Sequence, residues 1–320
     1  MSTFDPDALE CLAAIVEEGG FERAAQRLSI TQSAVSQRLR ALESQVGTVL
    51  IVRSRPLRPT AAGQLLLKHT KMLRLLRADL ERDLQELAPS SLGGAREEER
   101  ISIAINADSI ATWALQALTE LAQQGLPMEI ITDDQDFTHE WLRQGQVLGC
   151  VTTLKQALRG CKVVALGAMD YVAVAAPAFA QERLGGLGGV EGVERVEKVA
   201  LLTAHNFRDV PFVAFNRKDD MQSEFVGKAF GLKRVMLNQL FMPSSEGQVR
   251  AVLAGWGVAV VPRLLTQGLL DQGLLVNIAP AFSLPIQLYW HCWNLRSEVL
   301  DALTAALKRV AAASLVAQNV

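Results

Sequence analysis

The polar side chains with the clearest chemical pattern stand between residues 31 and 40. Glutamine can pair with adenine, arginine can pair with guanine, and serine can donate or accept, so such side chains can read base edges in the major groove of DNA. Residues 21–46 are predicted to form two helices joined by a tight turn at Ser29-Ile30-Thr31, with Thr31 as the N-cap of the second helix. A helix-turn-helix brings the first residues of its second helix to the bases. The candidate base-reading residues are Thr31, Gln32, Ser33, Ser36, Gln37, Arg38 and Arg40.

The net charge around this segment favours contact with DNA. From Gly20 to Arg74 the chain carries ten Lys or Arg residues against two acidic residues, a local net charge of +8, whereas the whole chain carries −2. Positive charge is the expected footprint of a protein that contacts phosphates. An ordinary surface helix with polar residues is the competing interpretation, and it does not account for the local excess of positive charge.

A basic turn follows the predicted helix-turn-helix. A short β-branched strand is expected at 48–52, and the turn after it carries three arginines within six residues. This arrangement is typical of the wing of a winged helix-turn-helix domain. The arginines are expected to hold phosphates or to enter the adjacent minor groove, with solvated surface charge as the alternative. They are Arg53, Arg55 and Arg58.

A long helix is predicted from its N-cap Thr60 to about Leu87. Leucines recur along it at intervals of seven residues, with two more between them. Such a narrow apolar stripe among charged residues is typical of a helix that pairs with a copy of itself. A single helix lying on a domain core is the competing interpretation. The predicted pairing residues are Leu66, Leu73, Leu76, Leu80, Leu84 and Leu87.

Several segments of the N-terminal third match one known family. They are a first helix at 7–18, AAQRLSITQSAVSQRLRALE at 24–43, Gly47, the basic segment IVRSRPLRPT at 51–60 and Ala62-Gly63. In these segments, and in its overall layout, the chain resembles the LysR-type transcriptional regulators. The short wing and the PSSEG segment at 243–247 resemble the ArgP and LysG branch, which controls basic-amino-acid export. The resemblance implies pairing of subunits through the linker helix and an effector such as lysine or arginine.

From residue 100 onward, short apolar strands alternate with helices. Strands are expected at 101–105, 128–132, 147–151, 163–166, 171–175, 199–202 and 210–215. This alternation predicts an α/β fold with mostly parallel sheets and helices on their faces. The family resemblance implies two α/β subdomains of periplasmic-binding-protein type. Subdomain I is expected at about 100–166 and 268–320, and subdomain II at about 167–267.

Polar residues follow several of these strands or open the helices after them. In open α/β sheets, ligands bind beyond the carboxyl ends of strands and at helix N-termini. Serine hydroxyls and helix amides could hold a carboxylate there, and a carboxylate side chain could hold a cation. The alternative is that these residues only cap helices or favour the helix dipole. The candidate effector-binding residues are Asn106, Asp108, Ser109, Thr152, Thr153, Asn216, Ser244, Ser245 and Glu246, with Asp133 as a further candidate for a cation.

Cysteine usage and hydropathy indicate the class of protein. The four cysteines are scattered, without a CxxC pair or a histidine at metal-ligand spacing, so no metal or cofactor is expected. Reduced thiols in a cytoplasmic protein are predicted, with a redox sensor as the alternative. No run of 18 uncharged apolar residues occurs, which predicts no membrane span. The acidic N-terminus also lacks the pattern of a signal peptide.

The chain is therefore expected to contain four consecutive parts. They are a winged helix-turn-helix domain (1–60), a linker helix (61–88), a hinge (89–99) and an effector-binding domain (100–320) with a Gly-rich surface insertion near 185–199. The expected function is a transcriptional regulator that binds double-stranded DNA as a homodimer or homotetramer, responds to a small effector and acts with RNA polymerase. A ligand-independent protein of chromosome-architecture or replication-control type is the alternative. An enzyme is not expected, because no nucleophile elbow or metal set is evident.

Overall fold

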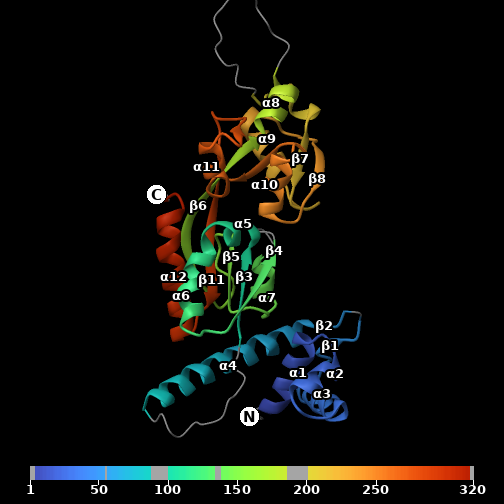
Figure 1. Ribbon diagram of the computed structural model, residues 1–320. Helices are drawn as coiled ribbons and strands as arrows, with labels where there is room; N and C mark the ends of the chain where they lie inside the picture. The colour runs from blue at the N-terminus through green and yellow to red at the C-terminus, as the bar shows by residue number, and fades with distance from the viewer. Residues whose placement is uncertain (1–3, 55, 88–99, 134–137, 186–200, 318–320) are drawn as a thin grey trace, which may run out of the picture.

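The computed structural model describes residues 4–54, 56–87, 100–133, 138–185 and 201–317. Figure 1 shows three consecutive parts: a small N-terminal head, the long helix α4, and a body built from two stacked subdomains. The expected hinge at 89–99 and the Gly-rich insertion beyond Gly185 lie outside the described residues. Within the described ranges, no helix is both long and apolar enough to cross a membrane.

The head is the predicted winged helix-turn-helix. Its helices are α1 (Pro6–Glu17), α2 (Phe21–Arg27) and α3 (Gln32–Val46), and they enclose a buried apolar core. The wing is a two-stranded antiparallel ribbon of β1 (Ile51–Val52) and β2 (Arg58–Pro59). The first strand begins later than the expected residue 48. The amide of Leu50 donates to the Glu43 carboxylate at 2.9 Å, so the chain before Ile51 is tied to α3.

Helix α4 (Ala61–Leu87) connects the head to the body. Thr60 caps it as predicted, because its hydroxyl accepts the Gly63 amide at 3.1 Å. The first part of α4 contributes Leu66 and Leu67 to the core of the head. About two turns further on, Leu75 is buried in the core of the body. Helix α4 therefore packs on both parts of the molecule.

One seven-stranded sheet runs through both subdomains. Its order is β10-β6-β11-β5-β3-β4, with β9 also paired to β6. Subdomain I contains β3 (Ile101–Asn106), α5 (Ala107–Ser109), the π-helical turn η1 (Ile110–Ala114), α6 (Leu115–Gln123), β4 (Met128–Asp133), α7 (Thr138–Arg143), β5 (Gly149–Thr152), β11 (Leu284–Trp293) and α12 (Glu298–Ser314). Subdomain II contains α8 (Pro177–Leu184), η2 (Phe207–Asp209), β7 (Pro211–Ala214), α9 (Met221–Phe230), β8 (Asn238–Phe241), α10 (Ser245–Leu253), β9 (Ala259–Pro262), α11 (Arg263–Asp271) and β10 (Val276–Asn277).

The two subdomains are joined by two long antiparallel strands. Strand β6 (Cys161–Ala175) is one continuous strand of 15 residues, where the sequence predicted two separate strands. It pairs with β11 in subdomain I and with β9 and β10 in subdomain II. Gly167 lies in β6 with a φ of 130°, and a Cβ there would lie 2.9 Å from Leu315 Cβ. The close approach of the C-terminal segment therefore requires glycine at this position.

Three expectations about the body need correction. Subdomain I was expected to resume at about residue 268, but that residue lies within α11, and the chain returns to subdomain I later, through β11. The sheet is mixed rather than mostly parallel, because β3 is parallel to β4 and β5, whereas β6 and β11 are antiparallel. Leu201 and Leu202 form no strand, and the Leu202 amide instead donates to the Ile278 carbonyl at 2.7 Å.

Candidate DNA-binding and effector sites

Helix α3 packs one face into the head and leaves its polar face outward. Val35, Leu39 and Leu42 are buried. Most of the predicted base-reading residues are exposed on the remaining surface, and Ser36 is half-buried. This arrangement exposes hydrogen-bonding groups at the start of the helix that would enter a major groove. The exposed residues are Gln32, Ser33, Gln37 and Arg40.

Three of the predicted base-reading residues have structural contacts, and one of these contacts is between the Thr31 and Ser33 hydroxyls at 2.9 Å. The hydroxyl of Thr31 accepts the Ala34 amide at 3.2 Å, so it forms the N-cap of α3. The guanidinium of Arg38 lies 3.1 Å from the Asp7 carboxylate of α1. Arg38 therefore helps to hold α3 against α1, in addition to any contact that it makes with DNA.

The wing presents two described arginines to solvent. Arg53 follows β1 and lies over the Phe21 ring at 5.4 Å, which fixes its position beside α2. Arg58 is exposed in β2. Arg55 lies outside the described residues. The exposed arginines flank the reading helix, as a phosphate-binding wing requires.

The predicted pairing stripe on α4 is exposed over most of its length. Its described leucines from Leu73 onward are between 42% and 56% exposed, which leaves a row of large apolar side chains in solvent. Leu66 is an exception, because the head covers the start of α4 and buries this side chain. Leu65, which was not predicted, is 72% exposed near the same face. The side chain of Leu87 is not among those described, and the exposed leucines of the stripe are Leu73, Leu76, Leu80 and Leu84.

A small cavity lies between the two subdomains. Subdomain I supplies Asn106, Asp108 and Asp133 to its lining, and subdomain II supplies residues of α9, α10 and the loop after β7. Asn106 is buried, and its Oδ1 has no hydrogen-bond partner within the described part of the chain. Three carboxyl groups and no lysine or arginine occur among the described lining residues, so the cavity favours a cation. From subdomain II and the connecting strand come Tyr171, Phe215, Asp219, Met221, Gln222, Gln248 and Val260.

Asp108 lies at the contact between the subdomains. The Tyr171 phenol donates to its Oδ2 at 2.5 Å. Burial raises the pKa of the Asp108 carboxyl, while the nearby Ser245 hydroxyl and the Tyr171 phenol act in the opposite direction. Because no lysine or arginine occurs among the described lining residues, a cationic ligand would supply a counter-charge to this carboxylate.

A larger hollow of about 470 Å³ lies next to this cavity and shares Asp133 with it. Such a volume suits a small metabolite. Its wall from subdomain I is acidic and aromatic, because it includes Glu140 and Trp141, and the Trp141 indole donates to the Asp133 carboxylate at 2.9 Å. Its wall from subdomain II is polar and basic and consists of Asn216, Arg217 and Lys218.

The other predicted effector residues divide into three groups. Ser245 is buried beside Asp108, whereas Ser244 is the exposed N-cap of α10 and accepts the Gly247 amide at 3.1 Å. Glu246 is exposed and does not line either cavity. Subdomain I buries the remaining residues of the set or leaves them half-buried, and none of them lines the cavities. They are Ser109, Thr152 and Thr153.

Sequence reasoning missed several cavity residues. Tyr171 was treated only as a strand residue, although a tyrosine where the chain crosses between subdomains can reach both. Gln222 was also missed, and its amide group bonds both the N–H and the C=O of Val260. Gln248 is buried three residues after Ser245 on α10. The sequence signal that could have identified these two residues is a glutamine on a helix face that is otherwise apolar.

The cysteines do not form a reactive or metal-binding group. Burial raises the pKa of all four thiols, so they are protonated at neutral pH and less reactive than a sensor thiol. Among the residues that the structure describes, no group of three or more His, Cys, Asp or Glu side chains has a geometry for metal binding.

Family models match most of the chain. Residues 6–64 match the bacterial regulatory helix-turn-helix protein of the lysR family, and residues 94–312 match the LysR substrate binding domain. The HTH-type transcriptional regulator ArgP of Pseudomonas aeruginosa is 38% identical over 308 residues, 96% of each chain. ArgP of Aeromonas salmonicida is 38% identical over 296 residues, 92% of each chain.

Solved structures agree with these matches. The crystal structure of ArgP from Mycobacterium tuberculosis has a TM-score of 0.80 and 34% identity, with coverage of 99% of this chain and 100% of that chain. Full-length LysG from Corynebacterium glutamicum with bound effector Arg has a TM-score of 0.70 and 31% identity, with coverage of 98% and 99%. These findings confirm the resemblance to the ArgP and LysG branch. The chain belongs to the LysR family of bacterial transcriptional regulators.

Proposed function

We propose that this protein is a transcriptional regulator whose binding to DNA is switched by a basic amino acid held between the two subdomains. The observation that carries the proposal is the acidic cavity around Asp108, whose described lining includes three half-buried carboxyl groups and no lysine or arginine. The structure of the relative LysG with bound effector Arg supports the same class of ligand.

The charges around the two cavities suggest an orientation for the ligand. In this proposal the guanidinium or ammonium of the side chain lies beside Asp108, where Asp219 adds negative potential. The ligand's α-carboxylate lies in the adjacent hollow, toward Arg217 and Lys218, and its α-ammonium lies toward Glu140. Opposite charges at the two ends of the site then match the two ends of arginine or lysine.

DNA binding and subunit pairing complete the proposal. The exposed polar face of α3 reads bases and the wing arginines hold phosphates. The exposed leucine stripe of α4 pairs two subunits, because a row of large apolar side chains in water is otherwise unfavourable. A dimer, or a tetramer formed from two dimers, then places two reading helices on one operator. In this proposal the protein regulates transcription in the cytoplasm together with RNA polymerase, and it does not catalyse a reaction.

Calorimetric titration of the full chain with arginine, lysine and citrulline tests the effector. Citrulline has nearly the shape of arginine but carries a neutral urea group in place of the guanidinium. Arginine or lysine is expected to bind, citrulline is expected to bind at least about tenfold more weakly, and Asp108→Asn is expected to remove this difference. If no basic amino acid binds and DNA binding persists, the ligand-independent alternative replaces this proposal.

A further inference from the structure

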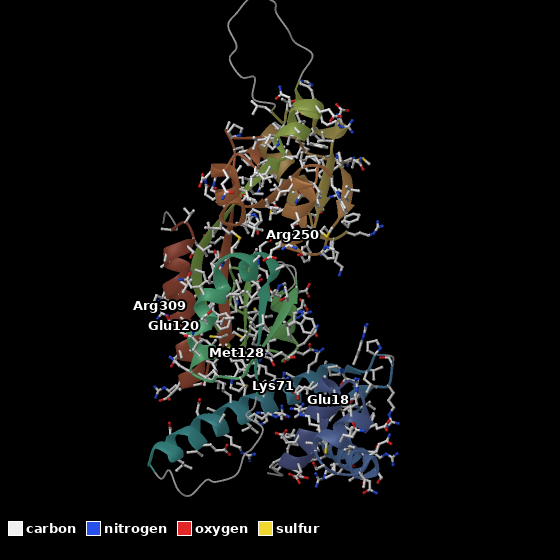
Figure 2. All side chains as sticks on the ribbon, in the orientation of Figure 1. Glu18, Lys71, Glu120, Met128, Arg250 and Arg309 are labelled. Atoms are coloured by element: carbon white, nitrogen blue, oxygen red, sulfur yellow. The ribbon has the colours of Figure 1, made fainter. Side chains whose placement is uncertain are left out.

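Three basic residues on α4, one turn apart, lie at the junction of the head and the body. Lys68 contacts the body, where its Nζ donates to the Arg159 carbonyl at 3.3 Å. Arg74 binds the head, with its Nε 2.9 Å from Glu10 and its Nη1 3.1 Å from Glu17 of α1. Figure 2 places Lys71 at this same junction, between the head and the lower edge of the body.

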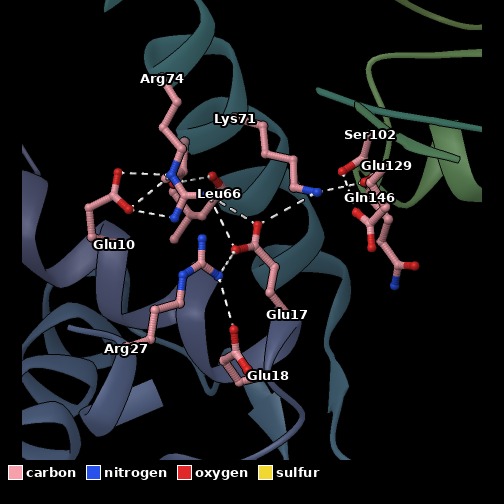
Figure 3. Close-up of polar contacts among 11 residues, drawn as sticks. Glu10, Glu17, Glu18, Arg27, Leu66, Lys71, Arg74, Ser102, Glu129 and Gln146 are labelled. Atoms are coloured by element: carbon pink, nitrogen blue, oxygen red, sulfur yellow. Dashed lines mark hydrogen bonds and ion pairs between the residues drawn. The ribbon is translucent and has the colours of Figure 1, made fainter. Parts of the chain in front are cut away.

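Lys71 contacts both parts of the molecule. Its Nζ donates to the Gln146 carbonyl of the body at 2.5 Å, and it lies 3.6 Å from the Glu17 carboxylate of the head. Figure 3 shows this ammonium between Glu17 on one side and Gln146, Glu129 and Ser102 on the other. Any change in the distance between head and body must therefore stretch or break a contact of Lys71.

Burial makes these contacts costly to lose. The Lys71 side chain is only 13% exposed, and burial lowers the pKa of its ammonium while Glu17 raises it. Burial also acts to raise the pKa of Glu17, but Arg74, Lys71 and Arg27 outweigh it and hold that pKa below its usual value. Removing the Glu17 carboxylate would take this ion pair away from the buried Lys71 ammonium, which is unfavourable for a buried charge.

The body side of the junction is continuous with the wall of the ligand hollow. Trp141 and Gln144 line the hollow, and the Trp141 carbonyl accepts the Gln146 amide at 2.9 Å. Between them, Gly145 has a φ of 73° and lies against the α4 backbone, where a Cβ would be 2.9 Å from Lys68 Cβ. One segment, 141–146, thus faces the ligand hollow and contacts α4.

We propose that Lys71 is a positioning residue that transmits closure of the ligand hollow to the orientation of the DNA-binding head. A ligand that shifts Trp141 and Gln144 also shifts the Gln146 carbonyl. Lys71 follows this carbonyl and pulls on Glu17, which moves α1 together with the reading helix that packs on it. The ligand identity rests on the function proposed above, whereas the role of Lys71 in fixing the head does not.

The test compares Lys71→Met with Lys68→Met in the full chain. DNA fragments selected by the wild-type protein from a random library serve as the probe, and their Kd is measured with and without saturating arginine. The effect of arginine is expressed as the ratio of the two Kd values. In Lys71→Met this ratio is expected to be closer to one than in the wild type, by about fivefold or more. In Lys68→Met the ratio is expected to stay within about twofold of the wild-type ratio. Lys71→Arg, which keeps the charge, is expected to recover part of the response.

Small-angle scattering without DNA or arginine gives a second, ligand-independent readout. Lys71→Met is expected to broaden the distribution of interatomic distances, and Glu17→Gln is expected to do the same from the head side if Lys71→Met does not fold. Wild-type behaviour of the folded Lys71→Met variant in both the Kd ratio and the scattering would overturn the proposal. If arginine leaves wild-type DNA binding unchanged, the effector assignment fails, and the scattering comparison alone decides the role of Lys71.

Discussion

The phenol of Tyr171 donates a 2.5 Å hydrogen bond to the Asp108 carboxylate, and this contact joins strand β6 to helix α5 at the edge of the acidic cavity. Tyr171→Phe removes one donor from a buried carboxylate that is proposed to bind the ligand cation. The affinity for arginine is expected to fall about tenfold, because a hydrogen bond to a charged group contributes roughly 1.5–3 kcal/mol. Calorimetric titration measures the change.

The second tyrosine of the chain provides the matched control. Tyr289 is buried in β11, opposite Thr152 and Ala165, and it does not line the ligand cavity. Tyr289→Phe is therefore expected to leave the arginine affinity unchanged. Equal losses of affinity in the two variants would mean that Tyr171 acts only through the stability of the sheet.

The raised pKa of Asp108 predicts that arginine binding depends on pH. Burial favours the protonated carboxyl in the free protein, whereas the guanidinium favours the carboxylate, so binding releases a proton. Affinity is expected to increase as pH rises through the pKa of the free protein and to level off above it. Titrations in two buffers of different ionisation enthalpy count the released protons. Asp108→Asn is expected to abolish the proton release. If the variant releases as many protons as the wild type, another group is the source of the protons.

Much of the fold could be predicted because caps and periodicity are local signals. Thr31 and Thr60 each cap the helix that the sequence predicted, with the hydroxyl accepting an amide three residues ahead. These contacts depend only on the residue type and its neighbours in the chain. The exposed part of the α4 stripe followed from the same kind of local pattern.

The cavity could be predicted only in part, because its residues are distant in the sequence. Tyr171 and Asp108 are 63 residues apart, and their contact depends on where β6 crosses between the subdomains. Leu66 fits the heptad pattern of α4, but the packing of the head overrides that pattern and buries the side chain. A periodic pattern indicates which face is apolar, and it does not indicate which partner covers that face.

The two DNA-binding surfaces are expected to respond differently to substitution. Arg53→Ala should weaken binding to all DNA sequences and reduce the slope of log Kd against log salt by about one, since one phosphate contact is lost. Gln32→Ala should instead relax base preference at one position, at a cost of about 1–3 kcal/mol on the preferred sequence. Binding to selected and random DNA over a range of salt separates the two effects. Arg296→Ala, an exposed arginine of the body, is the control, and equal behaviour of Arg53→Ala and Gln32→Ala would contradict this division.

The leucine stripe of α4 is expected to control assembly. Leu80→Glu places a charge in the middle of the proposed pairing surface, so the subunits should separate and sedimentation should show a lower mass. Leu115→Glu substitutes a similarly exposed leucine on α6 and should leave the mass unchanged. Leu66→Ala should lower the stability of the head by about 2–5 kcal/mol because its side chain lies in the core. If Leu80→Glu leaves the sedimentation mass unchanged, the subunits pair through a surface other than the leucine stripe of α4.

The turn of the helix-turn-helix carries a strained residue. Ser29 has a φ of 54°, in the left-handed region that costs a residue with a Cβ about 1–2 kcal/mol. Ser29→Gly removes this cost but adds freedom to the unfolded chain, so a net stabilisation of about 0.5–1 kcal/mol is expected. Hydrogen exchange of peptides from 21–46 should therefore slow by about two- to fivefold. Ser33→Gly, within the first turn of α3, should accelerate the same exchange, because glycine there weakens the helix without relieving any strain. Faster exchange in Ser29→Gly would show that contacts of the serine side chain outweigh the strain of its backbone.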